Sequence, residues 1–142
     1  MARVDFYVLN QQGEQARNTF ACKLAEKAYR LDNTVHIHVS DTDQARELDQ
    51  LLWTFRQGSF VPHHRIDQPA PGMNSPVTIG CQTEHAARHD LLINLSEELP
   101  DCAGSFDRIA ELVTSDEDAR NRSRERYAAY REQGHELETH KL

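Results

Sequence analysis

Residues 3–55 read RVDFYVLNQQGEQARNTFACKLAEKAYRLDNTVHIHVSDTDQARELDQLLWTF, and two local patterns alternate along this stretch. Residues 3–9 and 34–39 are rich in β-branched and aromatic side chains, which favours strands. Residues 15–31 and 42–55 carry apolar side chains every three or four positions, which predicts amphipathic helices. The order strand, helix, strand, helix favours an α/β fold with a mostly parallel central sheet flanked by helices.

Each of the two predicted helices has an apolar face that we expect to pack on the sheet. The first helix presents five residues at helical spacing: Ala16, Phe20, Leu24, Ala28 and Leu31. The second presents Ala45, Leu48, Leu52 and Phe55. Ser40, followed by Asp43 three positions later, resembles a capping box that starts the second helix.

The second half of the chain is less regular. Residues 56–75 contain two glycines and three prolines, and they predict a long ordered loop of the kind that usually carries function. Residues 77–80 predict a short strand, and the apolar run DLLINL at 90–95 predicts a strand covered on both faces. The apolar spacing within 103–113 predicts a third helix. An arginine-rich last helix is expected over about 116–133, with acidic residues in its first turn that stabilise the helix dipole.

Length and composition indicate one domain over residues 1–142. A chain of 142 residues with 38% hydrophobic residues can bury a core without a disulfide or a metal. Cys22, Cys81 and Cys102 form no CxxC motif, so we expect reduced thiols in a cytoplasmic protein. The formal net charge of −7 argues against a fold-wide basic surface for nucleic acid.

Motifs for catalysis and cofactor binding are absent from the sequence. The loop after the first predicted strand, NQQGEQ at 10–15, has a single glycine and therefore no backbone cradle for phosphates. Three close histidine pairs occur: His36 and His38, His63 and His64, and His85 and His89. None of these pairs has a third and fourth metal ligand at a known spacing. We therefore expect no catalytic residue, no metal and no cofactor.

The last predicted helix concentrates positive charge. Its arginines are Arg120, Arg122, Arg124, Arg126 and Arg131, and positions 120, 124, 127 and 131 share one helical stripe. Arginine can bind a carboxylate through two parallel hydrogen bonds, and Tyr127 offers a flat apolar wall. A peptide C-terminus, which presents a carboxylate beside a side chain, fits this stripe. The alternatives are a solvated helix face whose arginines balance nearby acids, and a site for nucleic-acid phosphate.

A second cluster joins the second helix to the long loop. It consists of Leu51, Leu52, Trp53 and Phe55, followed by the segment SFVPH at 59–63. Aromatic residues beside a proline-rich loop are typical anchors of a protein interface. The alternative is that they cap the hydrophobic core beneath the loop.

These residues, taken in order, resemble a known family. The matching segments are FYVL at 6–9, LW at 52–53, SFVPH at 59–63, PVTI at 76–79, DLLINL at 90–95, RERY at 124–127, YR at 130–131 and Gly134. Their order and spacing resemble the chi subunit of bacterial DNA polymerase III over essentially the whole chain. The resemblance implies a nucleotide-binding-like fold without a P-loop and no catalytic activity.

The resemblance also implies partners and the surfaces that bind them. Chi-like proteins pair with the psi subunit of the clamp loader and bind the acidic C-terminal tail of single-stranded DNA-binding protein. Some pair with an iron-sulfur helicase through the psi surface. By matching position, the psi or helicase surface comprises Trp53, Phe60 and Pro62. The tail pocket comprises Val113, Arg120, Arg124 and Tyr127. Ala128 stands where relatives carry a lysine, and Arg131 compensates for the positive charge that is missing there.

The resulting expectation is a non-catalytic clamp-loader subunit that bridges psi and the tail and contacts DNA only indirectly. One rival is a nucleotide-binding α/β enzyme with its site at Asn10, Ser40 and Ser96, at the carboxyl ends of the strands. Another rival is a protein that binds single-stranded DNA directly, with Tyr127 stacking on bases.

Overall fold

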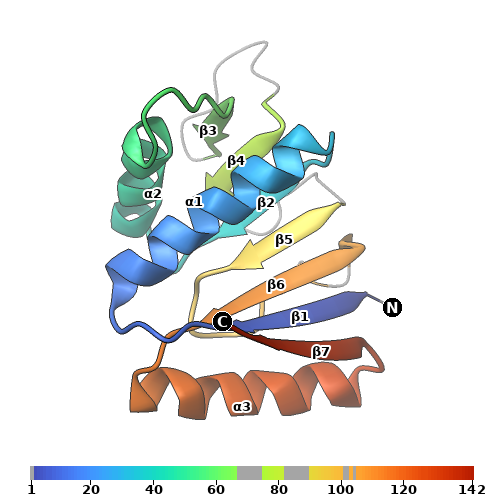
Figure 1. Cartoon of the computed structure of the whole chain (residues 1–142). Helices are drawn as coiled ribbons and strands as arrows, with labels where there is room; N and C mark the ends of the chain where they lie inside the picture. The colour runs from blue at the N-terminus through green and yellow to red at the C-terminus, as the bar shows by residue number, and fades with distance from the viewer. Residues whose placement is uncertain (1, 67–74, 82–89, 101–102, 104) are drawn as a thin grey trace.

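The computed structural model describes residues 2–66, 75–81, 90–100, 103 and 105–142, which form one α/β domain (Figure 1). Along the chain the elements are β1 (Arg3–Val8), α1 (Glu14–Arg30), β2 (Val35–His38), α2 (Thr42–Thr54), β3 (His63–Arg65), β4 (Val77–Gly80), β5 (Leu91–Asn94), β6 (Arg108–Val113), α3 (Glu117–Glu132) and β7 (Glu136–Lys141). All strand pairings are parallel, in the order β3-β4-β2-β5-β6-β1-β7. The predicted fold class is therefore confirmed.

The helices cover the two faces of the sheet unequally. Helices α1 and α2 pack on one face, over β2, β4 and β5, whereas α3 packs on the opposite face at β1 and β6 (Figure 1). On β6, Ala110 and Leu112 face the first core, and Ile109 and Val113 face the second. Because side chains alternate along a strand, one strand supplies both cores.

Helix α1 contacts the sheet through small side chains rather than through the whole predicted stripe. Its buried apolar residues are Ala21, Cys22, Ala25 and Ala28. Of the predicted stripe, Leu24 is half-buried and Leu31 is 65% exposed. Helical periodicity defines the spacing of a face but does not decide which of two adjoining apolar stripes meets the sheet.

Helix α2 follows its prediction closely, apart from its N-cap. Ala45, Leu48 and Leu52 are buried as expected. The N-cap is Asp41 rather than Ser40, because the Asp41 carboxylate accepts a hydrogen bond of 2.8 Å from the Gln44 backbone N–H. An aspartate at this position satisfies one of the amide donors that a helix start leaves without a partner.

The helix predicted over 103–113 is wrong, because residues 108–113 form β6. This strand lies between β5 and β1 and is buried from Ile109 to Val113. A short apolar run covered on both faces has no period-2 alternation, so its spacing resembles that of a helix. The predicted strands at 77–80 and 90–95 are confirmed as β4 and β5.

Two strands escaped prediction. Strand β3 lies inside the expected loop, and β7, with the sequence ELETHK, forms one edge of the sheet. Charged side chains are common on edge strands because they discourage pairing with other chains, and they hide the strand pattern. Residues 67–74 of the expected loop, together with His85, His89 and Cys102, lie outside the described residues. No helix among the described residues has the length and apolar character needed to cross a membrane.

A buried histidine on β2 predicts sensitivity to acid. The Nδ1 atom of His36 lies 2.7 Å from the Thr78 hydroxyl, and burial, assisted by nearby His38, lowers the pKa of His36 to about 3. The unfolded chain binds this proton near pH 6.5, so the stability contributed by neutral His36 is complete above about pH 6.5 and is lost as the pH falls towards 3.

We expect His36→Gln, which cannot titrate, to reduce the acid sensitivity. Between pH 7.5 and pH 4.5 the unmodified protein should lose about 2–3 kcal/mol more of its free energy of unfolding than the variant, since each pH unit within the window is worth about 1.4 kcal/mol. Urea unfolding at the two pH values measures the difference. Equal losses in the two proteins would contradict the assignment.

Candidate protein-interaction sites

A cavity lies where the carboxyl ends of three parallel strands meet α3. Its volume is about 500 Å³, and it is lined by Val8, Leu9, Asn10, Val113, Arg120, Ser123, Arg124, Lys141 and Leu142. The last residues of β1, β6 and β7 form one wall, and the first half of α3 forms the other. We call this cavity the strand-end pocket. It brings together three residues that the sequence predicted: Val113, Arg120 and Arg124.

The strand-end pocket combines positive charge with an apolar floor. Arg120, Arg124 and Lys141 supply the charge, and no acidic side chain belongs to its lining. In the part of the chain that the structure describes, neither Arg120 nor Arg124 forms an ion pair, and Arg124 Nη1 donates only to Asn121 Oδ1 at 3.2 Å. These guanidiniums are therefore available to an external anion, beside the apolar side chain of Val113.

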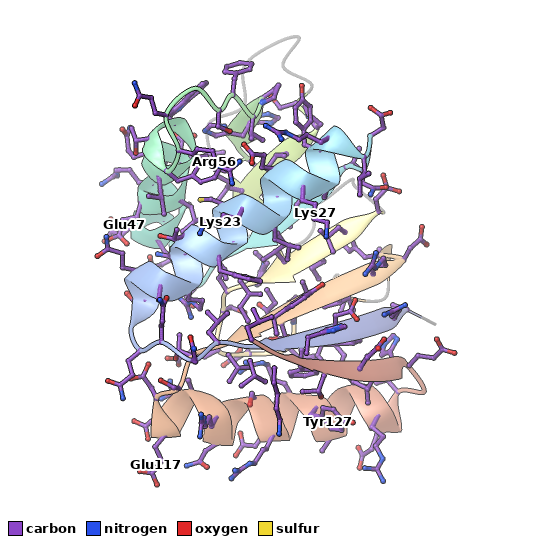
Figure 2. The ribbon with its side chains drawn as sticks, in the orientation of Figure 1. Lys23, Lys27, Glu47, Arg56, Glu117 and Tyr127 are labelled. Carbon is purple, nitrogen blue, oxygen red and sulfur yellow. The ribbon has the colours of Figure 1, made fainter. Side chains whose placement is uncertain are left out.

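The other predicted residues of the arginine stripe lie outside the cavity lining. Half-buried Tyr127 packs its ring 5.3 Å from that of Phe6 on β1, so it supports α3 on the sheet next to the pocket (Figure 2). Arg131 is exposed in the last turn of α3. The sequence missed the walls that β1 and β7 supply, because strand pairing between the two ends of the chain leaves no local signal.

A buried polar network orients α3. The Glu111 carboxylate on β6 is fully buried and accepts hydrogen bonds from Arg126 Nε at 2.9 Å, Asn94 Nδ2 at 2.8 Å and the Tyr130 hydroxyl at 2.7 Å. Burial raises the pKa of Glu111, while the charge of Arg126 opposes that rise. Because Arg126 and Tyr130 must face Glu111, Arg120 and Arg124 are turned towards the strand-end pocket. Arg126 itself is structural.

The start of α1 is occupied by a carboxylate of the protein. The Gly13 backbone N–H donates to Asp116 Oδ2 at 3.0 Å, and the Thr114 hydroxyl donates to the same oxygen at 2.7 Å. The hydrogen bond from Gly13, which has the larger effect, and the one from Thr114 hold the pKa of Asp116 below its usual range. In a nucleotide-binding domain, a phosphate group takes the place of this carboxylate at the first strand–helix turn.

The residues of the rival enzyme site do not converge. Asn10 lines the strand-end pocket, Ser40 lines an acidic hollow beside α2, and Ser96 lines a small cavity near Arg126. The structure thus distributes the three polar groups over three hollows along the carboxyl edge of the sheet.

The second predicted site is an exposed aromatic pair. Trp53 near the end of α2 is 49% exposed, and Phe60 in the following segment is 64% exposed, with ring centroids 5.7 Å apart. Half-buried Pro62 follows in the same segment. Leu52, by contrast, is buried in the core, so the aromatic cluster divides between core and surface. We call Trp53, Phe60 and Pro62 the aromatic surface.

Polar residues, among them Glu26 and Arg56, which the sequence did not single out, hold the aromatic surface in place. His63 is buried beneath Trp53, 4.4 Å between ring centroids, and its ring nitrogens contact the backbone oxygens of Val61 at 2.6 Å and Asp49 at 3.1 Å. Glu26 on α1 binds Arg56 at 2.7 Å and the Ser59 hydroxyl. For Glu26, the only signal in the sequence was a glutamate within the predicted first helix.

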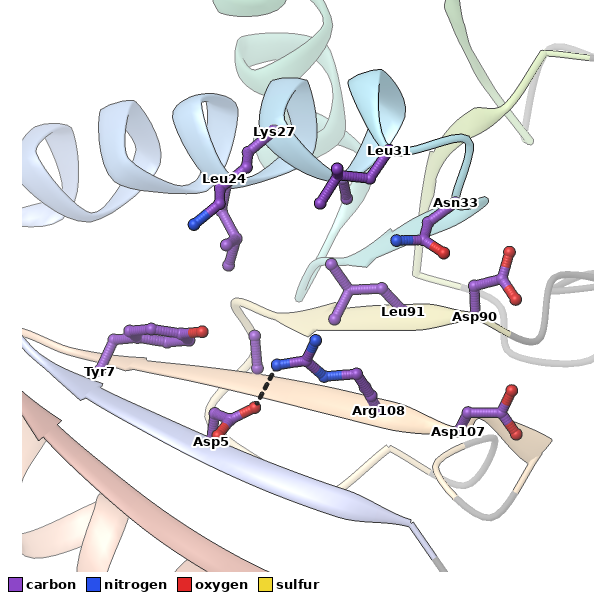
Figure 3. Close-up of a pocket in the computed structure, with 12 residues that line it drawn as sticks. Asp5, Tyr7, Leu24, Lys27, Leu31, Asn33, Asp90, Leu91, Asp107 and Arg108 are labelled. Carbon is purple, nitrogen blue, oxygen red and sulfur yellow. Dashed lines mark hydrogen bonds and ion pairs between the residues drawn. The ribbon is translucent and has the colours of Figure 1, made fainter.

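A third hollow, of about 190 Å³, lies between α1 and the uncovered face of β1 and β6 (Figure 3). Its charged floor is Asp5, which is bound by Arg108 at 3.0 Å, His140 at 3.0 Å and Arg3 at 3.2 Å. Burial raises the pKa of Asp5, but the hydrogen bonds and charges of these three partners lower it by more. The net shift of the pKa is therefore downward.

A possible metal ligand set lies beside this hollow. Among the described residues, Asp5, Glu138 and His140 place ligand atoms within 4.8 Å of one another. Arg3 and Arg108 already neutralise Asp5, and Arg3 also binds Glu138. A cation would have to displace these guanidiniums, so the geometry supports an ion-pair cluster rather than a metal centre.

The fold and its first strand–helix turn define a class: a doubly wound α/β protein that has the scaffold of a nucleotide-binding domain without its phosphate loop. Residues 1–138 match the family described as DNA polymerase III chi subunit, HolC, and the chain belongs to that family.

Three relatives carry the same name, DNA polymerase III subunit chi. The relative from Pseudomonas aeruginosa is 42% identical over 142 residues, covering 100% of this chain and 98% of its own length. The relative from Haemophilus influenzae is 35% identical over 135 residues, covering 94% of this chain and 93% of its own length. The relative from Escherichia coli K12 is 33% identical over 144 residues, covering 98% of this chain and 97% of its own length. The expected resemblance is thereby confirmed over the whole chain.

Proposed function

We propose that this chain is a non-catalytic accessory subunit of the bacterial replicative polymerase that bridges the psi subunit and the C-terminal tail of single-stranded DNA-binding protein. Membership of the chi family supports the assignment to the DNA polymerase III complex in the cytoplasm. The observation that supports the tail function is the strand-end pocket, with two guanidiniums that form no ion pair with any described residue, beside an apolar floor.

In this proposal the pocket recognises the end of the tail peptide. Arg124 binds the terminal carboxylate, and Arg120 and Lys141 add positive charge around it. Val113 receives the last side chain, and Tyr127 holds α3 at the correct distance by packing on Phe6. Arg131, further along α3, adds charge for the acidic residues that precede the end of the tail.

The aromatic surface is the proposed site for psi, and for an iron-sulfur helicase as an alternative partner. Exposed aromatic side chains held on a rigid support are favourable anchors because little conformational entropy is lost on binding. The aromatic surface lies next to β3, and the strand-end pocket lies at β1, β6 and β7, so the two flank opposite edges of the sheet. Psi and the tail can therefore bind together, whereas psi and the helicase exclude each other.

Titration with a labelled peptide that matches the acidic tail tests the pocket. We expect saturable binding, roughly micromolar for so small an interface. Arg124→Ala should weaken it by about tenfold or more, through loss of a charge-assisted contact. Removing the last residue of the peptide should have a similar effect, and added salt should weaken binding because exposed ion pairs are screened.

Arg46→Ala is the matched control. Arg46 is an exposed arginine on α2 and does not line the pocket, and its one ion pair among the described residues is with Asp43. The variant should bind the peptide as the unmodified protein does. If Arg124→Ala and the shortened peptide also bind without loss, the pocket is not the tail site. Binding of single-stranded DNA in the absence of peptide would favour the rival in which α3 contacts DNA directly.

A further inference from the structure

Arg17, near the start of α1, carries a shielded positive charge that no described carboxylate contacts directly, although Glu14, Glu97 and Glu111 lie near enough to favour its charged form. Its Nε and Nη2 atoms are shielded from solvent and make no hydrogen bond, and no ion pair of the described residues includes it. These two atoms form the edge of the guanidinium that binds carboxylates and phosphates through two parallel hydrogen bonds. Leaving such a charge unpaired is costly, so the surroundings of Arg17 indicate a missing anion.

Arg17 lines a small cavity at the carboxyl ends of β5 and β6. The cavity has a volume of about 70 Å³ and is lined by Arg17, Asn94, Ser96, Glu97, Leu112, Thr114, Ala119, Arg122 and Arg126. Three arginines face one acidic side chain, so the charge of the lining is positive. Space of this size accommodates several water molecules or a small oxyanion, since roughly 10–15 Å³ is enough for a water.

The other two arginines of the cavity already have partners. Arg126 binds the Glu111 carboxylate through Nε and the Glu97 carbonyl oxygen through Nη1, and Arg122 binds Glu97 Oε1 at 2.5 Å. Burial lowers the pKa of Arg17, and the charge of Arg126 lowers it further, while Glu14, Glu97 and Glu111 act in the opposite direction. An arginine stays protonated in proteins, so the positive charge of Arg17 persists.

We propose that the cavity between α1, α3 and the ends of β5 and β6 is an oxyanion site in which Arg17 binds a carboxylate or phosphate group, with Arg122 and Arg126 adding positive charge. The site is separate from the strand-end pocket. Arg122 and Arg126 project from a different face of α3 than Arg120 and Arg124. The proposal therefore does not depend on tail binding.

Nuclear magnetic resonance of the arginine side chains tests this site directly. Sodium phosphate, and separately sodium acetate, is added at constant ionic strength while the Nε–H resonance of Arg17, assigned by its loss in Arg17→Gln, is followed. We expect a saturable shift with at least one anion and none with chloride. Saturation by phosphate alone assigns a phosphate ligand, and saturation by acetate assigns a carboxylate such as an acidic side chain of a partner.

Variants provide the second readout, through the protein's backbone resonances near the cavity. Arg17→Gln should raise the apparent dissociation constant of the anion about tenfold or more. Arg17→Lys keeps the charge but cannot form the two parallel hydrogen bonds, so it should give a smaller rise. Lys23→Gln, at an exposed position of the same helix (Figure 2), should leave it unchanged. An Arg17 resonance that does not respond to either anion, or equal binding by Arg17→Gln, would overturn the proposal.

Discussion

Arg126→Leu is expected to lower the free energy of unfolding by about 3–5 kcal/mol, because it leaves the buried Glu111 carboxyl group without its cationic partner, so that this group must either stay charged in the core or take up a proton. Glu111 is fully buried, and Arg126 Nε is 2.9 Å from its Oε1 atom. The remaining hydrogen bonds from Asn94 and Tyr130 cannot neutralise the charge. Urea unfolding followed by circular dichroism measures the loss.

Two further variants separate the buried pair from general effects on α3. Arg131→Leu changes an exposed arginine of the same helix, and we expect it to alter the free energy of unfolding by no more than about 0.5 kcal/mol. Glu111→Gln should cost less in the Arg126→Leu background than in the unmodified protein, since it removes the unpaired charge and keeps an acceptor for Tyr130. A loss below about 1 kcal/mol in Arg126→Leu would mean that the pair contributes little.

Trp53→Ala is expected to weaken binding of the psi subunit by about a hundredfold. Truncating a central aromatic anchor typically costs about 2–4 kcal/mol of binding free energy, which corresponds to a factor of roughly thirty to a thousand. Trp53 is half exposed and pairs with Phe60, so it offers apolar area that only a partner can cover. Isothermal titration calorimetry with purified psi measures the affinity, and unfolding experiments confirm that the variant is folded.

Leu31→Ala is the matched control for this experiment. Leu31 is 65% exposed, follows the end of α1 and lines the third hollow, whose lining includes no residue of the aromatic surface, so its truncation should leave psi affinity unchanged. Trp53→Ala should also retain tail-peptide binding, because the strand-end pocket lies towards the opposite edge of the sheet. Full psi affinity in Trp53→Ala would place the psi interface elsewhere. Loss of both partners in one variant would indicate a folding defect.

The fold prediction succeeded where local patterns are strong. The first two strands and helices, and β4 and β5, lie close to their predicted ranges because helical and strand periodicity is encoded in neighbouring residues. It failed at β6, where apolar residues on both faces of a central strand resemble a helical face. It also failed at β7, whose charged sequence becomes a strand only by pairing with β1 at the other end of the chain.

For the two candidate sites, the residue types can be predicted from the sequence, whereas their arrangement in space depends on the packing of the chain. The arginines of α3 and the aromatic residues around Trp53 are visible in the sequence, because residue type and helical spacing are local properties. Which arginine is free depends on carboxylates distant along the chain: Arg126 pairs with Glu111, whereas Arg124 has no such partner among the residues that the structure describes. The walls of the strand-end pocket come from β1, β6 and β7, and Arg17 meets α3 only in the folded chain. Burial and charge pairing are properties of the packed structure, and for that reason they remained beyond a reading of the sequence alone.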